Sequence, residues 1–164
     1  REGGLRVADS RVDWSRERGV EVIRGTVHVG PGTFKPVSSE RIEEHVVDAE
    51  FAELSVSAAA EINAAREKGG RIVAVGTTSV RTLESAATDD GRVEPLSRMV
   101  DLYIKPGHQF KVVDRMITNF HLPKSSLLIL VSAFAGRERI LEAYRYAVDQ
   151  RMRFYSYGDA MMVV

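Results

Sequence analysis

Apolar and polar positions along the chain predict strands that alternate with helices. Short apolar runs with β-branched residues are typical of strands. They lie at 20–29, 72–75, 102–104, 112–118 and the C-terminal end. Longer stretches with helical spacing or helix-forming residues predict helices. These lie at 39–48, 56–68, 78–87, 123–136 and 138–150. Ser55 and Ser125 stand where N-caps are expected.

This order of elements indicates the fold class. Strands alternating with helices predict an α/β fold, with a mostly parallel sheet and flanking helices. No repeat, low-complexity tract or linker divides the 164 residues, so we expect one domain over 1–164. Residues 1–18 are rich in Arg and only weakly periodic, and they stand apart from this pattern.

Composition narrows the class of protein. The chain is 44% hydrophobic and 28% charged, which is typical of globular domains. The absence of cysteine excludes disulfides, thiolate metal sites and thiol nucleophiles. No apolar run reaches the roughly 18 residues of a membrane span, and the first residues lack the apolar core of a signal peptide. We therefore expect a cytoplasmic monomer with no membrane partner. The chain begins without Met, which suggests a fragment or a processed product.

Charge is unevenly distributed although the net charge is zero. Residues 40–67 carry eight acids and two bases, whereas residues 98–153 carry ten bases and five acids. A basic second half can contact nucleic-acid phosphates. The same pattern also fits two solvated helix faces, because like charges in sequence need not cluster in space.

Three glycine-rich or polar turns follow predicted strands. The first begins at His28 and continues through Gly30, Gly32 and Thr33. Backbone N–H groups in such a loop can bind a carboxylate or a phosphate. A plain turn with a hydrogen-bonded histidine explains the same residues.

The second turn runs from Gly76 through Thr77 and Thr78 into a helix. It places N–H donors and the positive end of a helix dipole at the carboxyl end of a strand, where ligands bind in α/β sheets. It lacks the Gly-Lys-Ser/Thr ending of a phosphate-binding P-loop. Ordinary capping by Thr77 or Thr78 is the alternative. Arg81 lies in the first turn, where the dipole disfavours a cation, so we expect it to have a partner: a ligand carboxylate, a phosphate or an acidic side chain of the protein.

The third turn carries Asn119, Phe120 and His121 before a helix. In extended conformation Asn119 and His121 share a face, and Phe120 points to the core. The asparagine can contact a base or a sugar edge, and the histidine can exchange a proton near neutral pH. Equally, both polar side chains can serve only to satisfy loop backbone groups.

Two weaker candidates remain. If residues 41–48 are helical, His45 and Asp48 share a face at i, i+3, with Glu50 close behind. A pair without a third ligand is a poor metal site, and a surface helix or a substrate contact explains it better. Near the C-terminus, Tyr155 and Tyr157 can stack a base or serve as part of a structural turn.

Taken together and in order, these motifs resemble the S-adenosylmethionine:tRNA ribosyltransferase-isomerase family. The resemblance covers residues 19–164, about the C-terminal half of a family member. It is carried by HVGPGTFKPV (28–37), VAVGTTSVRTLESAA (73–87), residues 103–113, TNFHLPKSSLLILVSAFAG (118–136) and FYSYGDAM (154–161).

The resemblance implies a reaction. Members transfer the ribosyl part of S-adenosylmethionine to the aminomethyl group of a 7-deazaguanine base in tRNA, and isomerise it to give epoxyqueuosine-tRNA. S-adenosylmethionine is thus a ribosyl-donating substrate, tRNA is the partner, and no metal takes part. The implied catalytic residues are His28, His45 and His121. The implied substrate-binding residues are Gly30, Gly32, Thr33, Glu50, Gly76, Thr77, Thr78, Arg81, Asn119, Tyr157 and Asp159.

The chain also departs from the family pattern. The resemblance does not include the family's separate β-barrel domain, which we do not expect in these residues, and residues 3–7 read GGLRV where AGLHF is usual. Asp48 stands where the family usually has a second histidine after His45. A non-catalytic fragment that binds S-adenosylmethionine or tRNA, or an inactive truncated protein, therefore remains an alternative. A Rossmann methyltransferase fits less well, because Gly30 and Gly32 do not open a helix.

Overall fold

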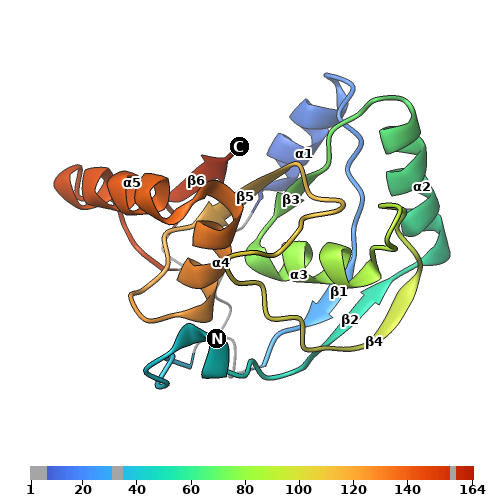
Figure 1. Ribbon diagram of the computed structural model, residues 1–164. Coiled ribbons are helices and arrows are strands. Elements are labelled where there is room, and N and C mark those ends of the chain that lie inside the picture. The colour runs from blue at the N-terminus through green and yellow to red at the C-terminus, as the bar shows by residue number, and fades with distance from the viewer. Residues whose placement is uncertain (1–6, 31–34, 156–157) are drawn as a thin grey trace.

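The computed structural model describes residues 7–30, 35–155 and 158–164, which form a mixed α/β structure with two three-stranded sheets (Figure 1). The first sheet has the order β1-β2-β4 and is antiparallel throughout. Its strands are β1 (Thr26–His28), β2 (Glu50–Leu54) and β4 (Leu96–Val100).

The second sheet has the order β3-β5-β6. Its strands are β3 (Val73–Val75), β5 (Arg115–Asn119) and β6 (Ala160–Val163). Only β3 and β5 are parallel, and β6 pairs with β5 in the antiparallel sense. The α/β class is therefore confirmed, but the prediction of a mostly parallel sheet is wrong. Between β2 and β4 the chain passes through α2, β3 and α3, and β3 pairs in the second sheet. The alternation of strands and helices therefore does not build one parallel sheet.

The helices mostly begin and end where the sequence predicts. They are α1 (Asp9–Arg16), α2 (Val56–Glu67), α3 (Thr77–Ala86), α4 (Ser126–Ala135) and α5 (Arg137–Asp149). The Ser55 and Ser125 side chains accept hydrogen bonds from the backbone N–H groups of Ala58 and Leu128, which confirms both N-caps. Among the described residues no helix has the length and apolar character to cross a membrane.

Several predicted elements differ from the structure. The acidic stretch 39–48 holds only a single 3-10 turn at Ile42–Glu44, because the backbone is extended at Arg41 and His45 on either side of it. The strand expected at 102–104 is absent, and the strand predicted over 20–29 is reduced to β1. Three elements were not predicted at all: α1, β2 and β4.

Helix α3 packs against strands of both sheets, and Figure 1 shows it in the centre of the molecule. Its Val80 is fully buried, as are Met116 of β5 and Leu130 of α4. Its Glu84 carboxylate is also buried and accepts hydrogen bonds from the backbone N–H groups of residues 111–113 at 2.8, 3.1 and 2.9 Å. The helix that follows the Gly76 turn is thus the common support of the two sheets.

Candidate active site

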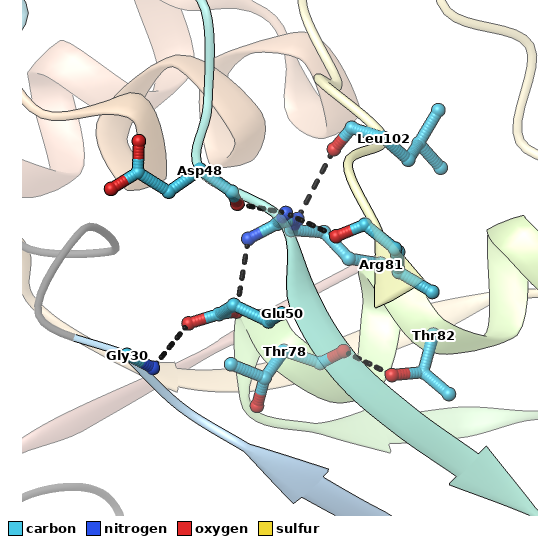
Figure 2. Close-up of polar contacts among 8 residues, drawn as sticks. Gly30, Asp48, Glu50, Thr78, Arg81, Thr82 and Leu102 are labelled. Atoms are coloured by element: carbon cyan, nitrogen blue, oxygen red, sulfur yellow. Dashed lines mark hydrogen bonds and ion pairs between the residues drawn. The ribbon is translucent and has the colours of Figure 1, made fainter. Parts of the chain in front are cut away.

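A buried ion pair joins α3 to the first sheet (Figure 2). Arg81 Nη1 lies 3.1 Å from Glu50 Oε2, and the two side chains are only 8% and 4% exposed. The same guanidinium donates to the backbone carbonyl oxygens of Leu102 (3.1 Å), Val100 (3.3 Å) and Asp48 (3.5 Å). Burial lowers the pKa of Arg81, and the charges of Glu50 and Asp101 oppose that shift. The partner expected for Arg81 is therefore an acidic side chain of the protein, Glu50.

The second oxygen of the Glu50 carboxylate extends the contact to the first glycine-rich turn. The backbone N–H of Gly30 donates to Glu50 Oε1 at 3.1 Å (Figure 2). The carboxylate thus connects the end of β1 with α3, which starts at the second turn. Glu50 and Arg81 also line a tightly packed crevice with Thr78 and Thr82, which leaves no room for a water molecule.

The turn between β3 and α3 requires glycine. Gly76 has φ +93° and ψ 145°, a region that is nearly restricted to glycine. Its N–H donates to the Ile117 carbonyl at 2.8 Å, which prolongs the β3–β5 pairing by one bond. Gly76 itself is the N-cap, without a side-chain cap, so the alternative explanation of this turn, capping by Thr77 or Thr78, is not found. Thr77 is buried, and the Thr78 carbonyl accepts from Thr82.

The third turn places its polar side chains in separate contacts. Asn119 Nδ2 donates to the Asp159 carbonyl at 2.9 Å and so closes the β5–β6 pair. His121 Nε2 lies 3.1 Å from Thr118 Oγ1, and its backbone N–H donates to the Tyr144 hydroxyl at 2.8 Å. Burial lowers the pKa of His121 to about 4, so the imidazole is neutral at pH 7. Asn119 and His121 are both buried, but each has its own partner.

The other histidines and Asp48, also predicted as site residues, each make contacts of their own. His28 is exposed at the end of β1, with its ring 5.5 Å from that of Phe51. His45 is half-buried and contacts the Tyr103 ring at 5.4 Å. The prediction that His45 and Asp48 share a helical face is wrong, because the 3-10 turn ends at Glu44. Asp48 instead pairs with Lys35 at 2.6 Å.

At the C-terminal end, the Asp159 carboxylate forms an ion pair with Arg153 at 3.1 Å. The hydrogen bond and charge of Arg153 lower the pKa of Asp159. Tyr155 has φ 71°, and its N–H donates to the Phe120 carbonyl. Gly32, Thr33 and Tyr157 lie outside the described residues. Within the described ranges, no three His, Asp or Glu side chains are grouped as a metal site requires.

Two tyrosines belong to this region although the sequence reasoning did not select them. Tyr144 was assigned to the apolar face of a helix, but its hydroxyl accepts from His121. Tyr103 lies with Arg81 and Ser126 around a second small crevice, of about 10 Å³, and its hydroxyl oxygen is buried without a hydrogen-bond partner among the described residues. The position of Tyr103 within a family-like block was the only available signal.

The fold and the site together define a mixed α/β protein whose candidate site residues follow the ends of β1, β3 and β5. Glu50 joins the Gly30 turn to Arg81 of α3, whereas His121 has separate contacts with Thr118 and Tyr144. Comparison of the sequence with protein-family models identifies the family of the chain. The chain belongs to the queuosine biosynthesis protein family, whose model it matches over residues 2–163.

Individual relatives carry a more specific name. The chain is 58% identical over 149 residues to S-adenosylmethionine:tRNA ribosyltransferase-isomerase of Moorella thermoacetica, covering 91% of this chain and 44% of that protein. It is 55% identical over 161 residues to the protein of the same name from Symbiobacterium thermophilum, covering 98% of this chain and 47% of the relative. The chain thus spans about half the length of these curated relatives.

A solved structure agrees with this assignment. The crystal structure of S-adenosylmethionine tRNA ribosyltransferase from Thermotoga maritima matches with a TM-score of 0.76 and 40% sequence identity. The match covers 96% of this chain and 50% of that one. The arrangement of two small sheets around α3 therefore corresponds to a family member's structure.

Proposed function

We propose that this chain carries part or all of the active site of an S-adenosylmethionine:tRNA ribosyltransferase-isomerase. The substrates are S-adenosylmethionine and a tRNA that bears the aminomethyl-deazaguanine base, and the product is epoxyqueuosine-tRNA. Adenine and methionine leave during the reaction. The names of the relatives support this activity.

One contact supports placing the active site around Glu50 and Arg81. The Glu50 carboxylate binds both the Gly30 N–H and the Arg81 guanidinium, so the end of β1 and the first turns of α3 are held at one place. A transferase for a nucleoside with a methionine tail needs several loops in a fixed relation, because positioning supplies much of the rate. The α3 N-terminus at Thr77 and Thr78 is suited to the methionine carboxylate.

The histidines differ in what they can do. The reaction needs a base that removes a proton next to the sulfonium, and an acid or cation that helps adenine leave. His28 is exposed beside the Gly30 turn, so we assign the proton-accepting role to it. His121 is buried and has a pKa of about 4, which suits a neutral hydrogen-bonding group better than an acid. His45, half-buried beside Tyr103, is the remaining candidate.

The test is adenine release from S-adenosylmethionine, measured by chromatography with pre-modified tRNA. The Symbiobacterium thermophilum relative serves as the positive control. We expect release that depends on the modified tRNA, from this chain alone or after the other half of that relative is added. His28→Ala should lower release by about 100-fold, the usual scale for a positioned acid or base.

No release under either condition, while the relative is active, would refute the proposal for this chain. Calorimetric binding of S-adenosylmethionine without any release would instead identify a non-catalytic binding fragment. Unchanged release by His28→Ala would refute only the role assigned to His28.

A further inference from the structure

The outer face of the first sheet carries a row of side chains that face solvent. The strand register places His28 opposite Phe51, and Phe51 opposite Met99. Because side chains alternate between the two faces of a strand, all three lie on the face opposite to Ala52 and Leu54, which are buried in the core with α3. We call these three residues the ring row.

The ring row is accessible although it is largely apolar. His28 is exposed, Phe51 is half-buried, and Met99 is 54% exposed. The rings of His28 and Phe51 meet edge to face at 5.5 Å, an arrangement that aromatic pairs favour. Flat aromatic surfaces on an exposed sheet are suited to stacking a nucleobase.

A polar row runs beside the ring row on the same face. The register places Thr26 opposite Glu53, and Glu53 opposite Ser97. All three are exposed. No ion pair of Glu53 is found among the described residues, in contrast to Glu50 on the inner face. The outer face therefore combines a stacking surface with a carboxylate available to a ligand cation.

We propose that this outer face binds the aminomethyl-deazaguanine base of the tRNA. The inference rests on the proposed function, which supplies the base. The bicyclic ring stacks on Phe51 with Met99 beside it, and the Glu53 carboxylate receives the cationic aminomethyl group. Charge selects this base over the adenine of S-adenosylmethionine, because adenine carries no ammonium group that would complement Glu53.

The second sheet offers a matched control surface. Its outer face aligns Val75, Ile117 and Met162 across the three strands, and Met162 is 52% exposed. This row is aliphatic. Met162→Ala therefore removes the same side chain at nearly the same exposure as Met99→Ala, but from a row that contains no aromatic residue.

The experiment measures binding of the free 7-aminomethyl-7-deazaguanine base to this chain by ligand-observed NMR titration. The 7-ethyl analogue, which lacks the ammonium group, and adenosine are the comparison ligands. Phe51→Leu keeps an apolar side chain and should weaken binding of the aminomethyl base about tenfold, as expected for a lost stacking contact. Glu53→Gln should weaken the aminomethyl base severalfold and leave the ethyl analogue unchanged. Met99→Ala should weaken binding of the aminomethyl base and of the ethyl analogue, and Met162→Ala should weaken binding of neither ligand.

Three results would overturn the inference. The first is no binding of the base to the unmodified chain. The second is equal affinity in Phe51→Leu, Met99→Ala and Met162→Ala. The third is adenosine bound more tightly than the aminomethyl base at this face, which would make it an adenine site. Melting curves of each variant exclude unfolding as the cause. Because no turnover is measured, base binding can persist when adenine release fails, so the two proposals fail separately.

Discussion

Removing the charge of Glu50 should destabilise the protein strongly, because the ion pair of Glu50 with Arg81 is buried. Glu50→Gln leaves the buried Arg81 guanidinium without its counter-charge, and the remaining amide cannot accept from both Gly30 and Arg81. Breaking one side of a buried pair costs about 3–5 kcal/mol. With a urea m-value of about 2 kcal/mol/M, the midpoint of unfolding should fall by about 2 M.

An exposed pair provides the matched control. Lys35 and Asp48 are closer together, at 2.6 Å, but their side chains are 63% and 50% exposed. Solvent screens such a pair, so Asp48→Asn should change the free energy of unfolding by about 1 kcal/mol or less. If Glu50→Gln and Asp48→Asn cost the same, water reaches the Glu50–Arg81 pair and the argument from burial is refuted.

A double-mutant cycle separates the pair from its surroundings. Arg81→Met also removes donors to three carbonyl groups, so it should be costly by itself. The variant with both Glu50→Gln and Arg81→Met should lose clearly less than the sum of the single losses, because no unpaired charge remains buried. Additive losses would mean that the two side chains do not interact.

Three further predictions can be checked by denaturation. Because the pKa of His121 falls from 6.5 unfolded to about 4 folded, the unfolded state binds more protons between these values, and stability should decline as pH falls from about 6.5 to 4. His121→Gln should remove this part of the pH dependence, and an unchanged profile would contradict the shift. Tyr144→Phe should cost about 1 kcal/mol through the lost bond to the His121 N–H, whereas Tyr103→Phe, whose hydroxyl has no partner among the described residues, should cost nothing or stabilise. Gly76→Ala should cost about 1–3 kcal/mol because of its backbone conformation, and Gly30→Ala, with φ outside the left-handed region and nothing near its Cβ, much less; equal losses would show that φ is not the cause.

Local chemistry was sufficient to predict the capped helices and the turn at Gly76. Ser55, Ser125 and the short run before Gly76 act through neighbours in sequence, so their signals are local. Strand β2 was missed because its inward positions begin with a charged residue, Glu50, which looks like a surface residue until Arg81 is placed against it. That contact spans 31 positions and has no local signal.

The same limit applies to the candidate site. The strand-end rule selected Gly76 and His121, which do follow the ends of β3 and β5, and their part in a ligand site stays a prediction. It could not assign their partners. The contact of His121 with Tyr144 joins a loop to a helix 23 positions later, and only the folded chain brings them together.

The position of α3 has a consequence for the folding of the whole molecule. Because residues of one helix fill the space beside both sheets, neither sheet can separate from α3 without exposing apolar surface of the other. The two sheets should therefore form a single cooperative unit, although no hydrogen-bonded strand pair joins them in the described part of the chain. Amide protons in β2 and in β5 would then exchange with solvent through the same global opening, at one common free energy.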